Sequence, residues 1–219
     1  HDVSEALQHA INKLKKEKNF GILFIPEGKY LISKTIYIPK AIRIIGYGKN
    51  RPEFILGKNT KGYQDENNYM FWFTSNLVEE GQEPRDASAG TFYSAISNID
   101  FRIGNGNPKA IALRTHFAQH SFVSHCNFYT GDGYAGIYDL GNEIENLKFF
   151  GGEYGISTGR TSPGWPVMMI DLYFEGQRSA AVLSRNTGMS ILSMHVKNAP
   201  VAVELQEGIS DRLFMEDCL

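Results

Sequence analysis

Residues 121–157 read SFVSHCNFYTGDGYAGIYDLGNEIENLKFFGGEYGIS, a run of short strands separated by polar, glycine-containing corners. An apolar–polar–apolar unit recurs along the second half of the chain at 99–101, 126–128, 147–149, 172–174 and 194–196. The last residues of successive units lie 27, 21, 25 and 22 positions apart. A second set of strands falls between them at 110–113, 136–138, 155–157, 180–183 and 201–205. A period in the low twenties with several short strands per unit predicts an all-β fold, a right-handed parallel β-helix of stacked coils.

Other repeat folds do not fit this pattern. A leucine-rich repeat has a similar period, but it requires leucine at fixed offsets and an Asn or Cys ladder, and neither is present. Alternating α/β folds are excluded because no helical periodicity follows Gly21. Residues 3–18 do have helical periodicity, which predicts an amphipathic α-helix that caps the first coil. The apolar stripe of this helix consists of Ala6, Leu7, Ala10, Ile11 and Leu14.

The sequence predicts a single domain over residues 1–219. It divides into a capping helix at 1–20, first strands at 21–56, polar loop insertions at 57–90 and regular coils at 91–219. The insertions are interrupted by an apolar run at 70–73. A solenoid end normally carries a polar cap, whereas Leu219 directly follows a strand. We therefore expect the β-helix to be truncated at its C-terminus and to belong to a longer parent protein.

The composition limits the partners. The formal net charge is −2 and the isoelectric point about 6.3, without the basic stripe that a nucleic-acid-binding protein shows. No apolar stretch approaches the roughly 20 residues needed to span a bilayer. The two cysteines, Cys126 and Cys218, lie about four coils apart, roughly 19 Å at about 4.8 Å per coil. A disulfide tolerates about 7 Å between Cα atoms, so we expect two free thiols, with Cys126 in the core.

Strand alternation predicts an outward-facing polar strip. One column of side chains contains Asp100, Asn127, Lys148, Tyr173 and His195. A second column, two residues earlier in each coil, contains Asn98, His125, Asn146, Asp171 and Ser193. Asp171 is the candidate catalytic carboxylate; Glu175, four strand residues further on, is roughly 13 Å away and too distant to pair with it. Glu153 or Asp132 on neighbouring coils could be its partner.

The strip also predicts substrate-binding residues. The loop at 160–166, which precedes the strand that carries Asp171, offers Trp165 as a flat platform for a sugar ring. The same loop carries Arg160. The full set of candidate binding residues is Trp165, Tyr173, Lys148, Asn146, His195 and Arg160. Two alternatives stay open: these are solvated polar residues on a sheet face, or they bind a ligand without catalysing a reaction.

No metal or other cofactor is expected. His116, His120 and His125 are close in sequence to Cys126. However, His116 and His120 fall at a turn, and Cys126 faces the opposite way from His125, whereas metal ligands must converge on one point. Calcium is a weaker possibility, because the acidic residues at 132, 139, 143, 145 and 153 turn to different sides of their coils. The glycine pairs at 104/106, 131/133 and 151/152 do not open helices, which excludes a phosphate-binding loop.

Several stretches resemble known proteins. DVSEALQHAI, GILFIPEGKYLISKTIYIP and IRIIGYG resemble the start of the pectate-lyase-like β-helix superfamily. FYSAISNIDF, AQHSFVSHCNF, GIYDLGNEIENLKFFGGEYGI and MMIDLYFEG resemble the first β-helix domain of glycoside hydrolase family 55 and bacterial proteins called family 28-related. The resemblance implies a secreted, periplasmic or cell-surface glycoside hydrolase or polysaccharide lyase acting on an extracellular polysaccharide. A second β-helix or C-terminal domain of the same parent chain would be its partner.

The sequence also departs from these families. The Asn-Thr-Asp, Asp-Asp, Gly-His-Gly and Arg-Ile-Lys motifs of family 28 polygalacturonases are absent. In family 55 enzymes the catalytic acid lies in the second β-helix, so the resemblance implies that this chain alone is inactive. The alternative is a non-catalytic glycan-binding β-helix, such as a tailspike or adhesin.

Overall fold

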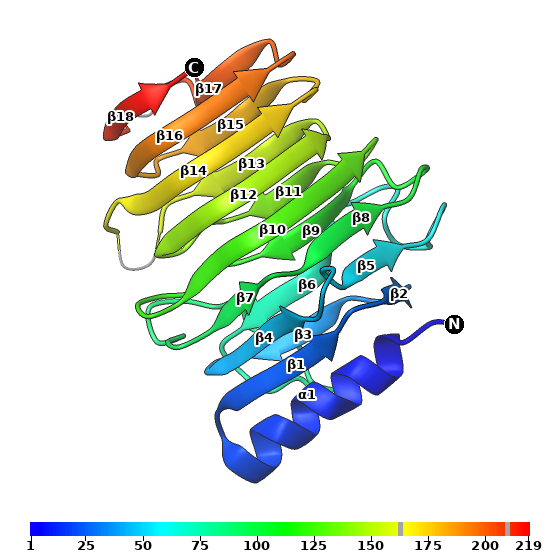
Figure 1. Ribbon diagram of the computed structural model, residues 1–219. Helices are drawn as coiled ribbons and strands as arrows, with labels where there is room; N and C mark the ends of the chain where they lie inside the picture. Colours follow the sequence, from blue (N-terminus) through cyan, green and yellow to red (C-terminus); the bar gives the residue numbers. More distant parts are fainter. Residues whose placement is uncertain (162–163, 209–210) are drawn as a thin grey trace.

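The computed structural model describes residues 1–161, 164–208 and 211–219. Its elements, labelled in Figure 1, are α1 (Ser4–Lys18), β1 (Gly21–Pro26), β2 (Lys29–Ile32), β3 (Ile36–Pro39), β4 (Ile42–Tyr47), β5 (Glu53–Leu56), β6 (Asn68–Thr74), β7 (Ala95–Ser97), β8 (Asp100–Ile103), β9 (Ala110–Arg114), β10 (Phe122–Gly131), β11 (Ala135–Tyr138), β12 (Glu143–Gly151), β13 (Tyr154–Gly159), β14 (Val167–Glu175), β15 (Ala180–Arg185), β16 (Met189–Lys197), β17 (Val201–Leu205) and β18 (Leu213–Cys218). The predicted helix is therefore confirmed, and the apolar run at 70–73 lies within β6.

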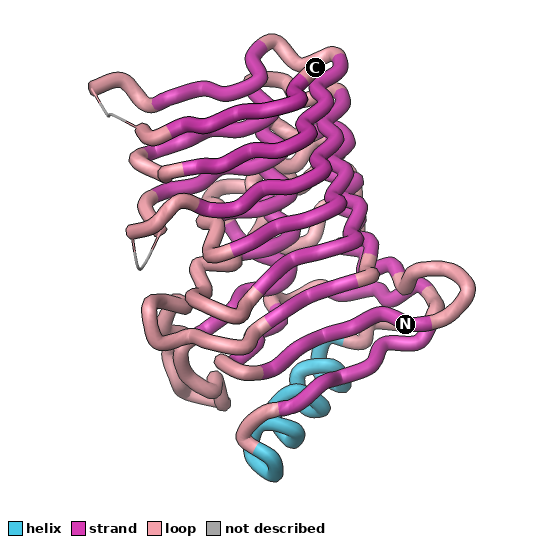
Figure 2. Tube along the Cα trace, turned by 60° about the vertical axis from the view of Figure 1, so that its left-hand side comes forward, coloured by secondary structure: helices cyan, strands magenta, loops and turns pink. Residues whose placement is uncertain are grey.

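The strands form two parallel sheets that stack coil on coil (Figure 2). Sheet A has the order β1-β4-β7-β10-β12-β14-β16-β18, with β2, β5 and β8 alongside. Sheet B has the order β17-β15-β13-β11-β9-β6-β3. Each regular coil contributes one strand to each sheet, and paired strands from successive coils run parallel, as between β12 and β14 or β13 and β15. The predicted parallel β-helix is confirmed.

A left-handed residue interrupts each long strand of sheet A. The φ angles are 54° at His125, 50° at Asn146, 54° at Asp171 and 60° at Ser193. Strict alternation would put Val123 and Cys126 on opposite faces, yet both are fully buried in one core. The chain therefore turns a corner at each of these positions. The predicted second column does point outward, but it forms a ridge along this corner and not a flat strip.

Ordered layers of side chains fill the core. The rings of Phe101, Phe128, Phe149 and Phe174 stack with centroids 5.5, 4.8 and 4.7 Å apart. Small residues of sheet B face this stack: the rings of Phe149 and Phe174 occupy the space that side chains at Gly136 and Gly155 would need. Large and small residues thus alternate across the interior, which gives close packing.

Helix α1 covers the N-terminal end of the solenoid. Leu7 and Ile11 are buried against the first coil. The amide of Gln8 substitutes for a neighbouring strand: it donates to the Tyr37 carbonyl at 2.9 Å and accepts from the Tyr37 N–H at 2.7 Å. This pairing satisfies the exposed edge of β3, which would otherwise be open to pairing with another chain.

The cysteine prediction is confirmed. Cys126 and Cys218 are both free, and Cys126 is fully buried in the core. Burial raises the pKa of the Cys126 thiol to about 12, so it remains protonated and unreactive in the folded protein.

Candidate functional site

The predicted strip residues on β12, β14 and β16 do lie side by side. Lys148 is in register with Tyr173, and Tyr173 with His195. The Tyr173 hydroxyl donates to Glu175 at 2.7 Å, and its ring lies 5.3 Å from the His195 ring. These side chains are half-buried or exposed on the outer surface.

Asn146 and Asp171 lie on the corner ridge beside this column. Asp171 is exposed, and no hydrogen bond or ion pair within the described parts of the chain joins its carboxylate to another side chain. The left-handed turn at Asp171 also separates it from the flat segment that carries Tyr173 and Glu175. The catalytic role of Asp171 therefore stays a prediction.

Trp165 and Arg160 lie far from the strip. Both come from the loop between β13 and β14, of which Ser162 and Pro163 lie outside the described residues. Six extended residues, roughly 20 Å, separate Trp165 from the corner at Asp171. The structure therefore divides the predicted binding set: Lys148, Tyr173 and His195 stay together on sheet A, while Arg160 and Trp165 belong to a different region.

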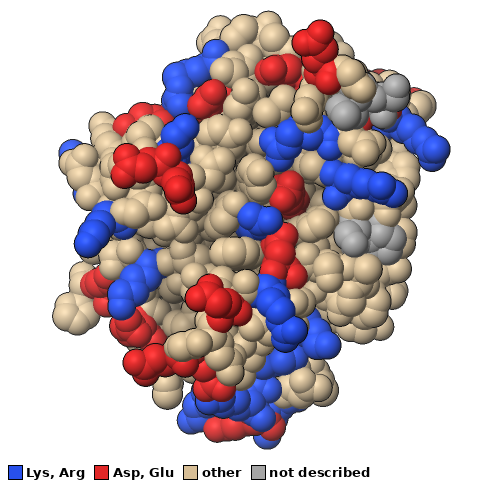
Figure 3. Space-filling view, turned by 180° about the vertical axis from the view of Figure 1, so that it is seen from behind, with Lys and Arg blue, Asp and Glu red and all other residues tan. Residues whose placement is uncertain are grey.

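Through the Arg160 backbone this loop contacts an ionic cluster at the ends of the sheet B strands, which was not predicted from the sequence. Arg114 ends β9, Asp139 follows β11, Arg185 ends β15, and Asp86 comes from the long loop after β6. Figure 3 views this face, where acidic and basic side chains are interleaved. We call the cluster of Asp86, Arg114, His116, Asp139 and Arg185 the sheet B site.

Arg114 is the centre of the sheet B site. Its Nε and one terminal nitrogen donate to the two oxygens of Asp86 at 2.9 and 2.8 Å, a bidentate geometry. The same nitrogen lies 3.5 Å from Asp139. One nitrogen thus contacts both carboxylates, which brings them closer than the upper limit of about 9.5 Å for the carboxyl pair of a glycosidase.

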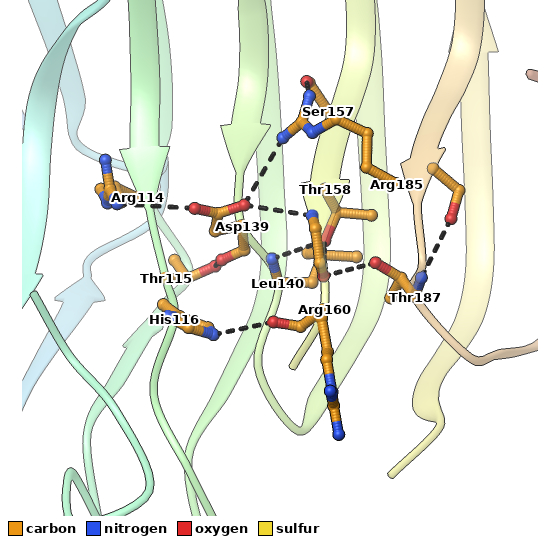
Figure 4. A network of polar contacts seen from close by, with 12 residues as sticks. Arg114, Thr115, His116, Asp139, Leu140, Ser157, Thr158, Arg160, Arg185 and Thr187 are labelled. Carbon is orange, nitrogen blue, oxygen red and sulfur yellow. Dashed lines mark hydrogen bonds and ion pairs between the residues drawn. The ribbon is translucent and has the colours of Figure 1, made fainter. Parts of the chain in front are cut away.

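Asp139 is held from several sides. In Figure 4, Arg114 and Arg185 approach its carboxylate from opposite directions, at 3.5 and 3.6 Å. The backbone N–H of Gly159 donates to it at 3.1 Å. Its side chain is only 17% exposed. Burial raises the pKa of Asp139 even though the neighbouring arginines oppose this.

Asp86 has the opposite tendency. Burial would raise its pKa, but hydrogen bonds from His116, Arg114 and Trp72 outweigh burial, and the pKa is lowered. The Trp72 indole donates to Asp86 at 2.7 Å, and His116 Nδ1 lies 3.4 Å from it. The hydrogen bond with Asp86 raises the pKa of His116. The site therefore holds one carboxyl group whose pKa is raised and one whose pKa is lowered.

Aromatic rings surround the same guanidinium. The Arg114 carbon Cζ lies 5.0 Å from the ring centroids of Tyr69 and Trp72 and 5.4 Å from that of Tyr138. Tyr69 also packs in a second apolar cluster with Ile111 and Ala135, on the outer side of sheet B. Rings of this kind present apolar faces with polar edges, a combination that suits sugar rings.

A third feature ties neighbouring loops to the site. His116 Nε2 lies 3.1 Å from the Arg160 carbonyl (Figure 4), and its other nitrogen faces Asp86. Arg160, predicted to bind substrate through its side chain, thus contacts the sheet B site through its backbone. The side chain of Arg160 is exposed.

The sequence did contain one signal for this site. Arg114, Asp139 and Arg185 follow or end the second strand set, so stacking that set would have placed them on neighbouring coils. Asp86 had no such signal, because its long loop has no fixed register in the sequence.

The described residues contain no group of three or more His, Cys, Asp or Glu arranged to hold a metal ion. No helix in the described part of the chain is long and apolar enough to cross a membrane.

The fold and the site define a class: a parallel β-helix whose outer face joins paired carboxylates to aromatic rings. The chain belongs to the family described as rhamnogalacturonase A/epimerase, pectate lyase-like, whose model matches residues 1–204. This confirms the resemblance to the pectate-lyase-like superfamily and places the chain among carbohydrate-active β-helix proteins. No curated protein matches the chain.

Solved structures share the fold. Geobacillus virus E2 ORF18 is similar with a TM-score of 0.63 and 16% identity, over 91% of this chain and 40% of that one. PfbA, a surface adhesin of Streptococcus pneumoniae, has a TM-score of 0.50 and 13% identity, over 98% of this chain and 63% of that one. An iota-carrageenase of family GH82 from A. fortis has a TM-score of 0.43 and 16% identity, over 94% and 54%. The chain spans less than two thirds of the length of each of these structures.

Proposed function

We propose that the protein is a glycoside hydrolase or polysaccharide lyase, or the β-helix part of one, and that the sheet B site binds and cleaves an extracellular polysaccharide. One observation carries the proposal: Asp86 and Asp139 share the Arg114 guanidinium, and their pKa values are shifted in opposite directions. Opposite pKa shifts are typical of a pair in which one carboxyl group acts as the acid and the other as the base. Family membership supports the carbohydrate class.

The residues have distinct roles in this proposal. Asp139, whose burial favours the protonated form, donates a proton to the glycosidic oxygen. Asp86, kept ionised by its three donors, supplies negative charge opposite the developing oxocarbenium ion. Water then adds to the anomeric carbon, and the proton that it loses returns to Asp139. Arg114 fixes the distance between the two carboxyl groups, and the rings of Trp72 and Tyr138 orient the sugar.

The test compares carboxamide variants on a panel of β-glucans, pectins and other glycans. Reducing ends report any cleavage, and an ultraviolet-absorbing unsaturated product separates a lyase from a hydrolase. We expect Asp139→Asn to lower kcat by about 10²–10⁴ and Asp171→Asn to leave it unchanged. The opposite result would move the site to the ridge on sheet A. Turnover by this chain on its own would contradict the expectation, drawn from the family 55 resemblance, that it is inactive alone.

A second function, glycan binding without cleavage, has its own support. The oxygens of Asp86 already accept hydrogen bonds from Arg114 and Trp72, which leaves little capacity for a substrate proton. In that case Asp139→Asn would preserve affinity for the polysaccharide, and Tyr138→Ala would weaken it. A secreted or cell-surface location and a second β-helix or C-terminal domain as partner belong to the same proposal.

A further inference from the structure

A large apolar pocket lies at the N-terminal end of the solenoid, where α1 turns into β1 (bottom of Figure 1). Its volume is about 680 Å³, within the range typical of small-molecule sites. The walls include Phe20, Ile22, Phe92 and Tyr93, which are 68, 45, 39 and 51% exposed. This concentration of large exposed apolar side chains is unusual for a protein surface and marks a binding site.

The backbone holds the pocket in shape. Gly21 N–H donates to the Ala41 carbonyl at 3.1 Å, and Ala41 N–H donates to the Phe92 carbonyl at 3.1 Å. The three walls, from the end of the helix, the β3–β4 turn and the loop before β7, are therefore hydrogen-bonded to one another. A preformed pocket loses little entropy when a ligand binds.

The rim is positively charged. Lys15, Lys40 and Arg43 line the pocket, and its lining contains no aspartate or glutamate. The Lys15 ammonium donates to the carbonyls of Asn19 and Lys40 at 2.7 and 2.8 Å. Arg43 Nε donates to the Tyr93 carbonyl at 3.3 Å.

Several cations elsewhere in the molecule pair with a carboxylate. Arg102 and Arg114, for example, pair with Glu53 and Asp86 at 2.7 and 2.8 Å. No ion pair within the described ranges involves Lys15, Lys40 or Arg43. Burial and the neighbouring Lys40 lower the pKa of Lys15, as expected for a cation without a counter-charge. The pocket therefore combines an apolar interior with unbalanced positive charge at its mouth.

We propose that this pocket binds an amphiphilic carboxylate, with its hydrocarbon chain between Phe20, Ile22 and Phe92 and its carboxylate facing Lys15, Lys40 and Arg43. A sugar fits poorly, because the lining offers few polar groups for its hydroxyls. A flat membrane surface fits poorly as well, because the site is hollow. The site is separate from the sheet B site, and the proposal does not depend on polysaccharide activity.

The probe is dodecanoate, titrated into the full chain at neutral pH below its micelle concentration and followed by calorimetry. Dodecyl maltoside carries the same hydrocarbon chain with a neutral head and serves as the matched ligand. We expect dodecanoate to bind at least about tenfold more tightly than dodecyl maltoside, because a hydrogen-bonded charge contributes about 1.5–3 kcal/mol.

Variants separate the two halves of the pocket. Lys40→Gln should weaken dodecanoate about tenfold and leave dodecyl maltoside unchanged, whereas Phe20→Ala should weaken both. Lys15→Gln repeats the charge test at a second position. Lys13→Gln, an exposed lysine on α1 outside the pocket, should change neither. Circular dichroism establishes that each variant is folded. Phe20, Lys40 and Lys13 are exposed, so removal of these side chains should be tolerated.

Three results would overturn the proposal. The first is that dodecanoate fails to bind the wild type, or that it binds the wild type and Lys40→Gln equally tightly. The second is tight, Phe20-dependent binding to phosphatidylglycerol vesicles without binding of the free carboxylate, which would make the patch a membrane contact. The third is self-association of the unliganded chain that Phe20→Ala abolishes, which would make it an interface between two copies. Polysaccharide cleavage by Lys40→Gln should match that of the wild type in every case.

Discussion

Gly136→Ala is the sharpest test of how the core is packed. An added Cβ at this position would lie 2.6 Å from Cδ1 and 2.8 Å from Cε1 of Phe149. Real Cβ atoms do not approach other atoms this closely, so a group must move. Phe149 has little freedom, because its ring is stacked 4.8 Å from Phe128 and 4.7 Å from Phe174.

The expected magnitude follows from two opposing effects. The φ of Gly136 is outside the left-handed region, so alanine is compatible with the backbone and would by itself stabilise the fold by about 0.4–1 kcal/mol. Overpacking a tight core costs typically 1–3 kcal/mol, and here it involves a rigid ring. We therefore expect net destabilisation of about 1–2 kcal/mol, which for a chain of this length lowers Tm by roughly 2–8 °C.

The assay is thermal and urea unfolding followed by circular dichroism, with Gly90→Ala as the matched control. A Cβ at Gly90 meets nothing within 4 Å and requires no left-handed φ, so this control should have unchanged or slightly higher stability. Combining Gly136→Ala with Phe149→Leu should cost less than the two single changes added together, because the smaller side chain makes room. An increase in Tm for Gly136→Ala, or strict additivity in the double variant, would refute the packing argument.

Three further outcomes are expected. The raised pKa of His116 contributes stability that is fully present below its ordinary value near 6.5 and is lost as the pH rises through the folded-state value. Urea midpoints of the wild type should therefore fall as the pH rises above about 6.5, and His116→Gln should flatten that slope. Arg114→Met leaves Asp86 and Asp139 without their shared cation and should cost roughly 2–4 kcal/mol in urea unfolding, whereas an unchanged midpoint would show that solvent screens the cluster. A thiol reagent should modify Cys218 in the folded protein and reach the buried Cys126 only in denaturant; rapid modification of both would contradict the core position.

The coil register can be predicted from the sequence because a short pattern within each repeat specifies it. The apolar–polar–apolar unit repeats with each turn, and hydrophobic burial fixes which face of each strand is inside. For this reason the alignment of Lys148, Tyr173 and His195, the burial of Cys126 and the capping helix are all predictable from the chain. The corner at Asp171 is less so. Asn, Asp and His are enriched at left-handed φ angles, as at His125 and Asn146, but Ser193 adopts the same conformation, so the residue type alone does not fix the corner.

The sheet B site depends on tertiary structure. Asp86 lies in a long loop, 28 residues before Arg114, and its pairing with that arginine depends on how the loop folds back over sheet B. The pKa directions of Asp86 and Asp139 depend on burial and on neighbours from other coils, which no sequence pattern specifies. By itself the sequence determines the β-helix, since one repeated local pattern is enough to stack coils. The pairing of Asp86 with Arg114 is decided only by the folded chain, because the long loop brings together residues that are remote in sequence.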